Sequence, residues 1–108
     1  MFILRIIPLT TLLSCVIVSA ADWPQWRGPN RDGKSAETGL LASWPAGGPR
    51  RVWTAEGLGT GYSSMAVVGG RLFTQGEQGD QGFVLAIDVN TGKPLWKTPA
   101  GRARSDER

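Results

Sequence analysis

The chain contains no histidine, and this absence limits the chemistry that its own residues could perform. Without an imidazole there is no Ser–His pair, no histidine-activated cysteine and no histidine ligand for a metal. Catalysis would therefore depend on carboxylates, lysine, tyrosine or a bound cofactor. The 9 acidic residues are scattered through predicted loops, and no two have a spacing that predicts general acid–base catalysis. We assign no catalytic, cofactor-binding or metal-binding residue from the sequence.

Three further patterns have a chemical and a structural interpretation. Gly57–Gly61 reads Gly-Leu-Gly-Thr-Gly, but a phosphate-binding loop leads into a helix, and the residues that follow here predict a strand. Glu77 and Asp80 share one polar stretch, where a solvated loop is a simpler explanation than a bound cation. Residues 62–64, Tyr-Ser-Ser, could line a channel rim, and packing or turn capping explains them equally well.

Trp53 and Trp96 could stack on a flat cofactor, because indole presents a large π-face. Their sequence context favours a packing role. Trp53 lies in Val-Trp-Thr-Ala and Trp96 in Leu-Trp-Lys-Thr, and the interval between them is 43 residues. Four-stranded propeller blades recur at about 40–45 residues. Equivalent positions in a repeat are expected to pack one blade against the next.

The residues around these tryptophans predict an all-β fold. From position 52 onward, apolar and β-branched runs alternate with glycine-containing turns, as in short antiparallel strands. We expect strands at Val52–Ala55, Ser64–Val68, Arg71–Gln75, Phe83–Asp88 and Pro94–Thr98. One period after Trp53 thus holds four strands, and their short connections predict an antiparallel meander, the architecture of a propeller blade.

Three connections between these strands have distinct sequences. Gly69-Gly70 has the two-residue spacing of a tight hairpin, because both positions need positive φ. Residues 76–82 predict a longer, flexible, polar loop. In the third connection, Asp88 or Asn90 can cap local backbone amides, and Gly92 can adopt the left-handed conformation that closes a bulged hairpin.

The region before residue 52 is rich in Trp, Pro, Gly and Asn, and it predicts an irregular lead-in. We expect turns at Pro29–Gly33 and Ala46–Pro49. Its tryptophans need burial, so the segment should lie over a larger body. We therefore divide the chain into a signal sequence at 1–20, an irregular lead-in at 21–51, one blade at 52–98, and a non-native-looking or disordered tail without β pattern at 99–108.

The first 20 residues predict an export signal helix. Arg5 supplies the positive start, Ile6–Val18 is an apolar run, and small residues place cleavage after Ala20, with Ala21 as the near alternative. This run is shorter than the roughly 20 apolar residues of a transmembrane helix. Leu-Leu-Ser-Cys ending at Cys15 resembles a lipobox, but the apolar run continues after it, which favours a cysteine in a discarded signal. We expect an exported, periplasmic or extracellular protein.

Residues 86–96 resemble the blade signature of the pyrroloquinoline-quinone-like (PQQ-like) repeat family of quinoprotein propellers. The signature reads Ala-x-Asp-x-x-Thr-Gly-Lys-x-x-Trp, and the matching residues are Ala86, Asp88, Thr91, Gly92, Lys93 and Trp96. The resemblance implies that the tryptophan docks onto a neighbouring blade, and that the glycine lets the hairpin turn.

The lead-in also resembles a subgroup of exported members of this family. The matching stretches are Trp23–Gly33, Trp44–Pro49 and Gly61–Ser64. Met65 is a departure, because the subgroup usually has proline at that place. The resemblance implies a fragment of a larger propeller, since propellers contain about 4–8 blades.

We expect the protein to be a binding or scaffold module without catalysis of its own. Its partners would be the missing blades, and proteins or cell-envelope components. Nucleic acid is not expected, because the net charge of +3 comes with no basic stripe or matching motif. The alternative that the resemblance implies is the N-terminal part of a quinoprotein alcohol or sugar dehydrogenase. Catalytic relatives hold PQQ and calcium with a catalytic Asp and often a vicinal Cys pair, and no residue here can be assigned to those roles.

Overall fold

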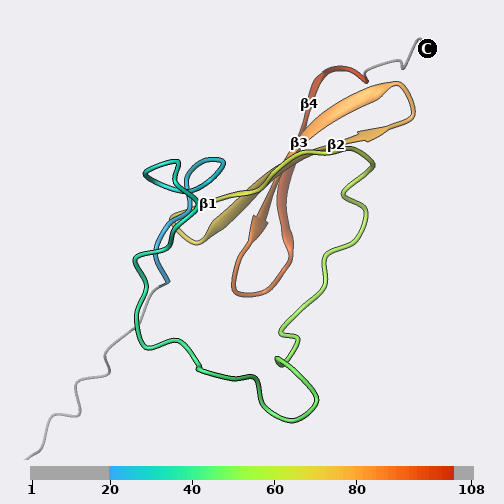
Figure 1. Ribbon diagram of the computed structural model, residues 1–108. Coiled ribbons are helices and arrows are strands. Elements are labelled where there is room, and N and C mark those ends of the chain that lie inside the picture. The colour runs from blue at the N-terminus through green and yellow to red at the C-terminus, as the bar shows by residue number, and fades with distance from the viewer. Residues whose placement is uncertain (1–19, 104–108) are drawn as a thin grey trace, which may run out of the picture.

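The computed structural model describes residues 20–103, which form an all-β protein with one antiparallel sheet and no helix (Figure 1). The strands are β1 (Ala66–Val68), β2 (Arg71–Gln78), β3 (Gln81–Asp88) and β4 (Pro94–Arg102). They pair in sequence order, each antiparallel to the next. The all-β class and the antiparallel meander predicted from the sequence are confirmed. The expected signal sequence lies, apart from Ala20, outside the described residues.

Two of the predicted hairpin connections are confirmed. Val68 pairs with Arg71, and the intervening Gly69 and Gly70 have φ values of 55° and 74°. In the connection between β3 and β4, Gly92 has a φ of 69°. The ladder also shifts register between Ala86 and Ile87, where Leu95 of β4 has no partner, so this irregularity lies beyond the turn itself.

The strand expected at Val52–Ala55 is absent, and the reason is that no neighbouring strand supplies hydrogen bonds to it. The flexible loop expected at 76–82 is also wrong. β2 and β3 continue pairing as far as Gln78 and Gln81, which leaves only Gly79-Asp80 as a tight turn. Cross-strand hydrogen bonding thus overrides the low β-propensity of the glycines in that stretch.

The strand end expected at Thr98 is wrong as well. β4 runs to Arg102, and the backbone N–H of Ala103 donates to the carbonyl oxygen of Asp80 at 2.7 Å. The first residues of the expected tail therefore belong to the sheet, and positions 104–108 lie outside the described residues. The prediction ended the strand at Thr98 because the polar and small residues that follow show no apolar alternation. In the structure these residues pair with the start of the long strand β3.

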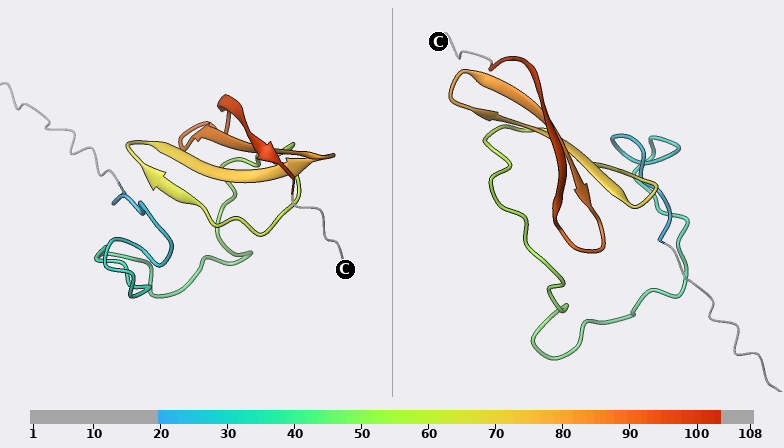
Figure 2. Two further views of the ribbon diagram at one scale, coloured as in Figure 1. Left: turned by 90° about the horizontal axis from the view of Figure 1, so that it is seen from above. Right: turned by 180° about the vertical axis from the view of Figure 1, so that it is seen from behind.

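One edge of the sheet is covered by the chain itself. Trp23 and Val67 exchange two backbone hydrogen bonds, of 2.8 and 2.9 Å, along the outer side of β1. Thr60 and Glu77 form a second isolated bridge beside β2. Figure 2 shows the twisted sheet from above and from behind, with the lead-in beside β1 and β4 at the opposite edge.

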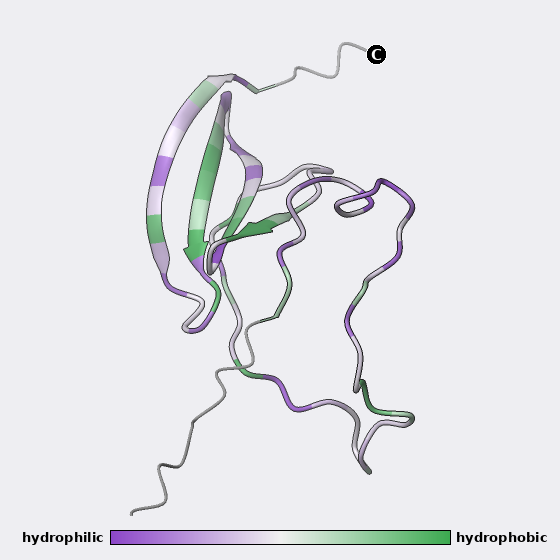
Figure 3. Ribbon diagram, turned by 90° about the vertical axis from the view of Figure 1, so that its left-hand side faces the viewer, coloured by the Kyte–Doolittle hydropathy of each residue, from purple (hydrophilic) through white to green (hydrophobic). Residues whose placement is uncertain are grey.

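The small core is centred on β3, where Leu85, Ala86 and Ile87 are 5%, 0% and 2% exposed. Figure 3 shows that hydrophobic residues dominate this strand, whereas β4 is mixed. Leu85 and Ile87 lie on one face, here called the covered face, because the segment Thr54–Leu58 lines a cavity together with them. Ala86 points to the other face, because side chains alternate along a strand.

The lead-in is irregular, as expected, and contains both predicted turns. The N–H of Gly33 donates to the carbonyl oxygen of Arg27 at 2.9 Å, and the N–H of Gly48 donates to that of Pro45, also at 2.9 Å. Burial of its tryptophans, however, is only partly realised. Trp23 is half-buried, but Trp26 and Trp44 are 69% and 68% exposed. The Arg27 guanidinium lies over the Trp26 ring, 5.4 Å from its centroid, but most of both indoles remains exposed within residues 20–103.

Candidate functional site

The most ordered functional candidate is the turn between β3 and β4, which Asp88 holds in shape. Its Oδ1 accepts hydrogen bonds from the backbone N–H groups of Asn90 and Thr91, both at 2.9 Å, and from the Thr91 hydroxyl at 3.1 Å. The backbone N–H of Gly92 donates to the carbonyl oxygen of Asp88 at 2.8 Å. The N–H of Thr91, followed by its hydroxyl, holds the pKa of the Asp88 carboxyl below its usual value. From the sequence, either Asp88 or Asn90 could cap this turn, and the structure shows that Asp88 does so.

Trp53 docks on this turn. Its indole Nε1 donates a hydrogen bond to the carbonyl oxygen of Val89 at 2.7 Å. The ring lies against Gly92, where an added Cβ would come within 2.6 Å of Trp53 Cδ2. Glycine is therefore required at position 92 for two reasons. The backbone has a positive φ, and the Trp53 indole packs where a side chain would lie.

The turn is fixed to the rest of the sheet through a second backbone contact. The N–H of Val89 donates to the carbonyl oxygen of Gly70 at 3.0 Å, which joins the turn to the β1–β2 hairpin. The Val89 peptide thus connects Trp53 on one side with Gly70 on the other. No sequence pattern indicates this residue, because Val89 acts through its backbone and its side chain is not involved.

Trp96 lies on the opposite face of the sheet, beside Ala86. Register places Phe73, Ala86 and Trp96 opposite one another on three adjacent strands. The rings of Phe73 and Trp96 have centroids 6.1 Å apart at an interplanar angle of 48°. This set of three residues is called the tryptophan face below. Phe73 was missed by the sequence reasoning, and its only signal is its position opposite Ala86 in the register.

The two tryptophans of the predicted repeat therefore differ in their surroundings. Trp53 is half-buried and bonded to a turn, whereas Trp96 is 44% exposed. Within residues 20–103, the indole N–H of Trp96 has no hydrogen-bond acceptor. The structure does not bring the two indoles together, and it places them on either side of one sheet. Trp53 is thus docked on a turn, whereas Trp96 remains available for contact with another surface.

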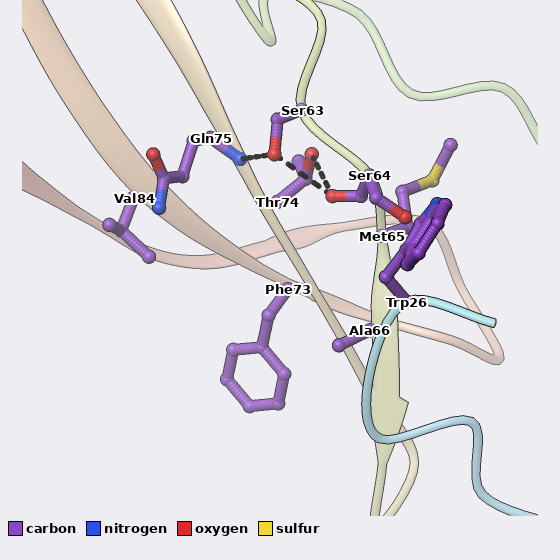
Figure 4. A pocket seen from close by; sticks show the side chains of 9 residues that line it. All are labelled: Trp26, Ser63, Ser64, Met65, Ala66, Phe73, Thr74, Gln75 and Val84. Carbon is purple, nitrogen blue, oxygen red and sulfur yellow. Dashed lines mark hydrogen bonds between the residues drawn. The ribbon is translucent and has the colours of Figure 1, made fainter. Parts of the chain in front are cut away.

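A cavity of about 240 Å³ lies where the chain enters β1 (Figure 4). The Ser63 hydroxyl donates to the carbonyl oxygen of Ser64 at 2.9 Å and accepts from the backbone N–H of Gln75 at 3.2 Å. The Thr74 hydroxyl donates to the same Ser64 oxygen at 3.4 Å. These hydroxyls cover the edge of β2 between its pairing with β1 and its bridge to Thr60, and neither serine has an adjacent base that would activate it. Tyr62 is fully exposed.

The glycines of Gly57–Gly61 also have a structural explanation. An added Cβ on Gly76 would come within 1.8 Å of the Leu58 carbonyl oxygen, and one on Gly59 within 2.6 Å of the Glu77 carbonyl oxygen. The segment crosses β2 so closely that a side chain fits neither at Gly59 nor at Gly76. Gly59 therefore brings the covering segment onto the sheet, whereas Gly57 and Gly61 have open space around them. The chain leads from this stretch into β1 and not into a helix.

No metal centre or membrane span is found in the described part of the chain. Within residues 20–103, no three His, Cys, Asp or Glu side chains gather as a metal site would need. The same residues contain no helix long and apolar enough to cross a membrane.

The fold and the turn define an all-β protein built on one four-stranded antiparallel sheet, with a tryptophan docked on its last hairpin. No family model, curated protein or solved structure matches the chain.

Proposed function

We propose that this chain is a blade-bearing part of an exported β-propeller of the PQQ-like repeat type, and that it serves as a binding or scaffold module. The observation that carries the proposal is the contact between Trp53 and the Val89–Gly92 backbone. Trp53 stands one period of 43 residues before Trp96, so its packing on the turn that precedes Trp96 would link successive periods of the repeat. Trp96, one period later, presents the same side chain to a turn that other blades would supply.

The shape of the sheet supports this proposal. Four strands in meander order match the number and connectivity of a propeller blade. β4 carries Pro94 and Pro99, and proline in a sheet is confined to an edge strand or to a strand's first residue. β4 therefore suits the outer rim of a propeller, where no further strand pairs. β1, whose edge is covered within the chain, would then lie toward the central channel.

Exposed apolar side chains supply the second line of support. Leu95 and Trp96 are 48% and 44% exposed on β4, and Val68 is 41% exposed on β1. A propeller blade buries both of its faces against neighbouring blades. The Val52–Ala55 segment fits the same arrangement, because it would be a strand only if another sheet supplied its neighbours. We assign a binding or scaffold role because these exposed apolar side chains form surfaces on which a partner can dock.

The proposal is tested by the self-association of the chain. We expect the wild-type chain to associate as its concentration rises, because the tryptophan face seeks a cover. Trp96→Ser should reduce this association, whereas the control Trp44→Ser removes a more exposed indole away from the sheet and should leave it unchanged. Analytical ultracentrifugation measures both. Equal association of the two variants, or a monomeric wild type, would contradict the proposal.

The dehydrogenase alternative has its own measurement. Adding PQQ and calcium to the longest natural form of the protein, and following dye-linked oxidation of alcohols or sugars, would reveal it. We expect no activity above that of the cofactor alone. Turnover that needs both PQQ and calcium would replace the scaffold assignment with an enzymatic one.

A further inference from the structure

The loop Arg27–Gly33 carries two arginines in an unusual backbone conformation. φ is 63° at Arg27 and 57° at Arg31, and these are the only positive values at non-glycine residues within positions 20–103. The left-handed region is unfavourable for any residue with a Cβ. Strain of this kind concentrates at functional sites, where surrounding contacts hold it in place. The side chains at these two positions therefore need an explanation beyond the turn.

The loop is braced internally. Besides the bond from Gly33 to Arg27, the N–H of Arg31 donates to the carbonyl oxygen of Gly28 at 3.1 Å. The Gln25 side chain bridges the loop, since its Nε2 donates to the Pro29 carbonyl oxygen at 3.1 Å and its Oε1 accepts from Arg31 Nε at 3.0 Å. The backbone that presents the arginines is thus held by side-chain and main-chain bonds together.

The loop is also anchored to the sheet. Gly28 is buried beneath the Trp23 ring, where an added Cβ would come within 2.6 Å of Cη2. Trp23 in turn exchanges both backbone hydrogen bonds with Val67 in β1. A rigid strand therefore positions the basic loop, and such preorganisation lowers the entropic cost of binding a ligand.

The positive charges of the loop are not neutralised by the described residues. Within residues 20–103, neither Arg27 nor Arg31 forms an ion pair. Arg31 uses only its Nε, which leaves its terminal nitrogens available, and the Arg27 guanidinium lies 5.4 Å from the centroid of the Trp26 ring. Asp32, the one acid of the loop, accepts from the backbone N–H of Lys34 at 3.0 Å.

We propose that this loop binds the carboxylate or sulfate groups of an acidic polysaccharide. Guanidinium groups match planar and tetrahedral oxyanions through paired N–H donors. The exposed indole of Trp26 beside Arg27 adds a flat apolar surface against which a sugar ring can pack. This inference goes beyond the proposed propeller assignment. The Arg27–Gly33 loop and the β1 strand that anchors it both belong to this chain, so the site needs no further blade.

The test compares two double variants that remove equal charge. Arg27→Asn/Arg31→Asn alters the loop, and asparagine tolerates positive φ, so the backbone is preserved. Arg50→Asn/Arg51→Asn is the control, because both arginines are exposed and lie outside the loop. The full chain is immobilised at low density, which prevents self-association, and titrated with alginate or dextran sulfate oligosaccharides. We expect the loop variant to lose about tenfold in affinity, and the control about twofold or less.

The two oligosaccharides distinguish a carboxylate ligand from a sulfate ligand. Equal loss in both double variants, no binding by the wild type, or equally tight binding of duplex DNA would overturn the proposal. Neutral dextran should not bind. Near-ultraviolet circular dichroism checks that the loop remains folded, and Arg27→Lys/Arg31→Lys provides a second variant that keeps the charge. Unchanged affinity in the lysine variant would also overturn the proposal, because the guanidinium groups would then not be used.

Discussion

The rings of Phe73 and Trp96 come together above Ala86, which separates their two strands and is itself fully buried. The small methyl group of Ala86 leaves room for the two aromatic rings to approach across the intervening strand. The matched alanine of the repeat signature thus has a physical role in this chain. Its smallness allows the tryptophan face to form a continuous apolar surface.

Enlarging Ala86 should therefore loosen the sheet. Ala86→Leu inserts a branched side chain between the rings and should destabilise β3 by about 1–3 kcal/mol through overpacking. The amide exchange rates of Leu85 and Ile87, followed by nuclear magnetic resonance, report this local stability. Ala100→Leu at an exposed position of β4 is the control and should change exchange by less than about threefold. Equal effects of the two substitutions would show that the rings do not close over Ala86.

Substitution of Gly92 should be more costly than substitution of a comparable turn glycine. Gly92→Ala adds a Cβ where φ is 69° and where the Trp53 ring already lies within 2.6 Å. Gly69→Ala has a similar φ of 55° but open space around its Cβ, so it should cost only the backbone strain, about 1–2 kcal/mol. The fluorescence of the Trp53 indole should shift to longer wavelength in the first variant alone. Matching exchange rates and spectra in both variants would contradict docking of Trp53 on the turn.

Acid should weaken the turn that receives Trp53. The folded chain holds the pKa of Asp88 below its unfolded value, so the carboxylate contributes stability that is fully present above the unfolded pKa, about 4. That contribution is lost as the pH falls through the lower, folded pKa. Amide exchange at Thr91, compared between wild type and Asp88→Asn from pH 6 to pH 3, measures it. The difference between the two proteins should shrink with acid, and a difference that is constant with pH would refute the role of the charge.

Thermal unfolding should be weak and non-cooperative in the isolated chain. Within residues 20–103, the core comprises three buried apolar residues on one strand, and a unit of the proposed propeller would need about two or more further units for stability. Differential scanning calorimetry should show a broad transition or aggregation. A sharp transition in a monomer, with equal calorimetric and van't Hoff enthalpies, would show that one sheet is enough.

The strands that the sequence predicted correctly are those whose partners lie within the chain. Gly69-Gly70 and the Asp88–Lys93 turn set the register of β1 to β4, and both can be read from turn chemistry alone. Val52–Ala55 has equal β-propensity, but local sequence cannot reveal whether a neighbouring strand exists. Residues 76–82 and the end of β4 failed for the opposite reason, because pairing extended strands through glycine and polar residues that propensity disfavours.

The candidate site was predicted in part. The residues of the matched signature indicated the turn and the two tryptophans, but not their different surroundings. The Trp53 indole donates its hydrogen bond to the backbone oxygen of Val89. Every residue has such an oxygen, so the residue type at position 89 does not reveal the contact. The left-handed arginines were equally hidden, since φ at Arg27 and Arg31 depends on the bracing by Gln25 and on the Trp23 ring.

Pro94 and Pro99 have a consequence for the way this chain would precipitate. A strand that lacks two amide hydrogens cannot serve as a regular template for stacked β-pairing, and Trp23 already occupies the opposite border of the sheet. Growth would have to proceed by adhesion of the broad surfaces around Trp96. Deposits formed in this way would be amorphous, without the ordered cross-β spacing that gives amyloid its dye binding and its resistance to solvent.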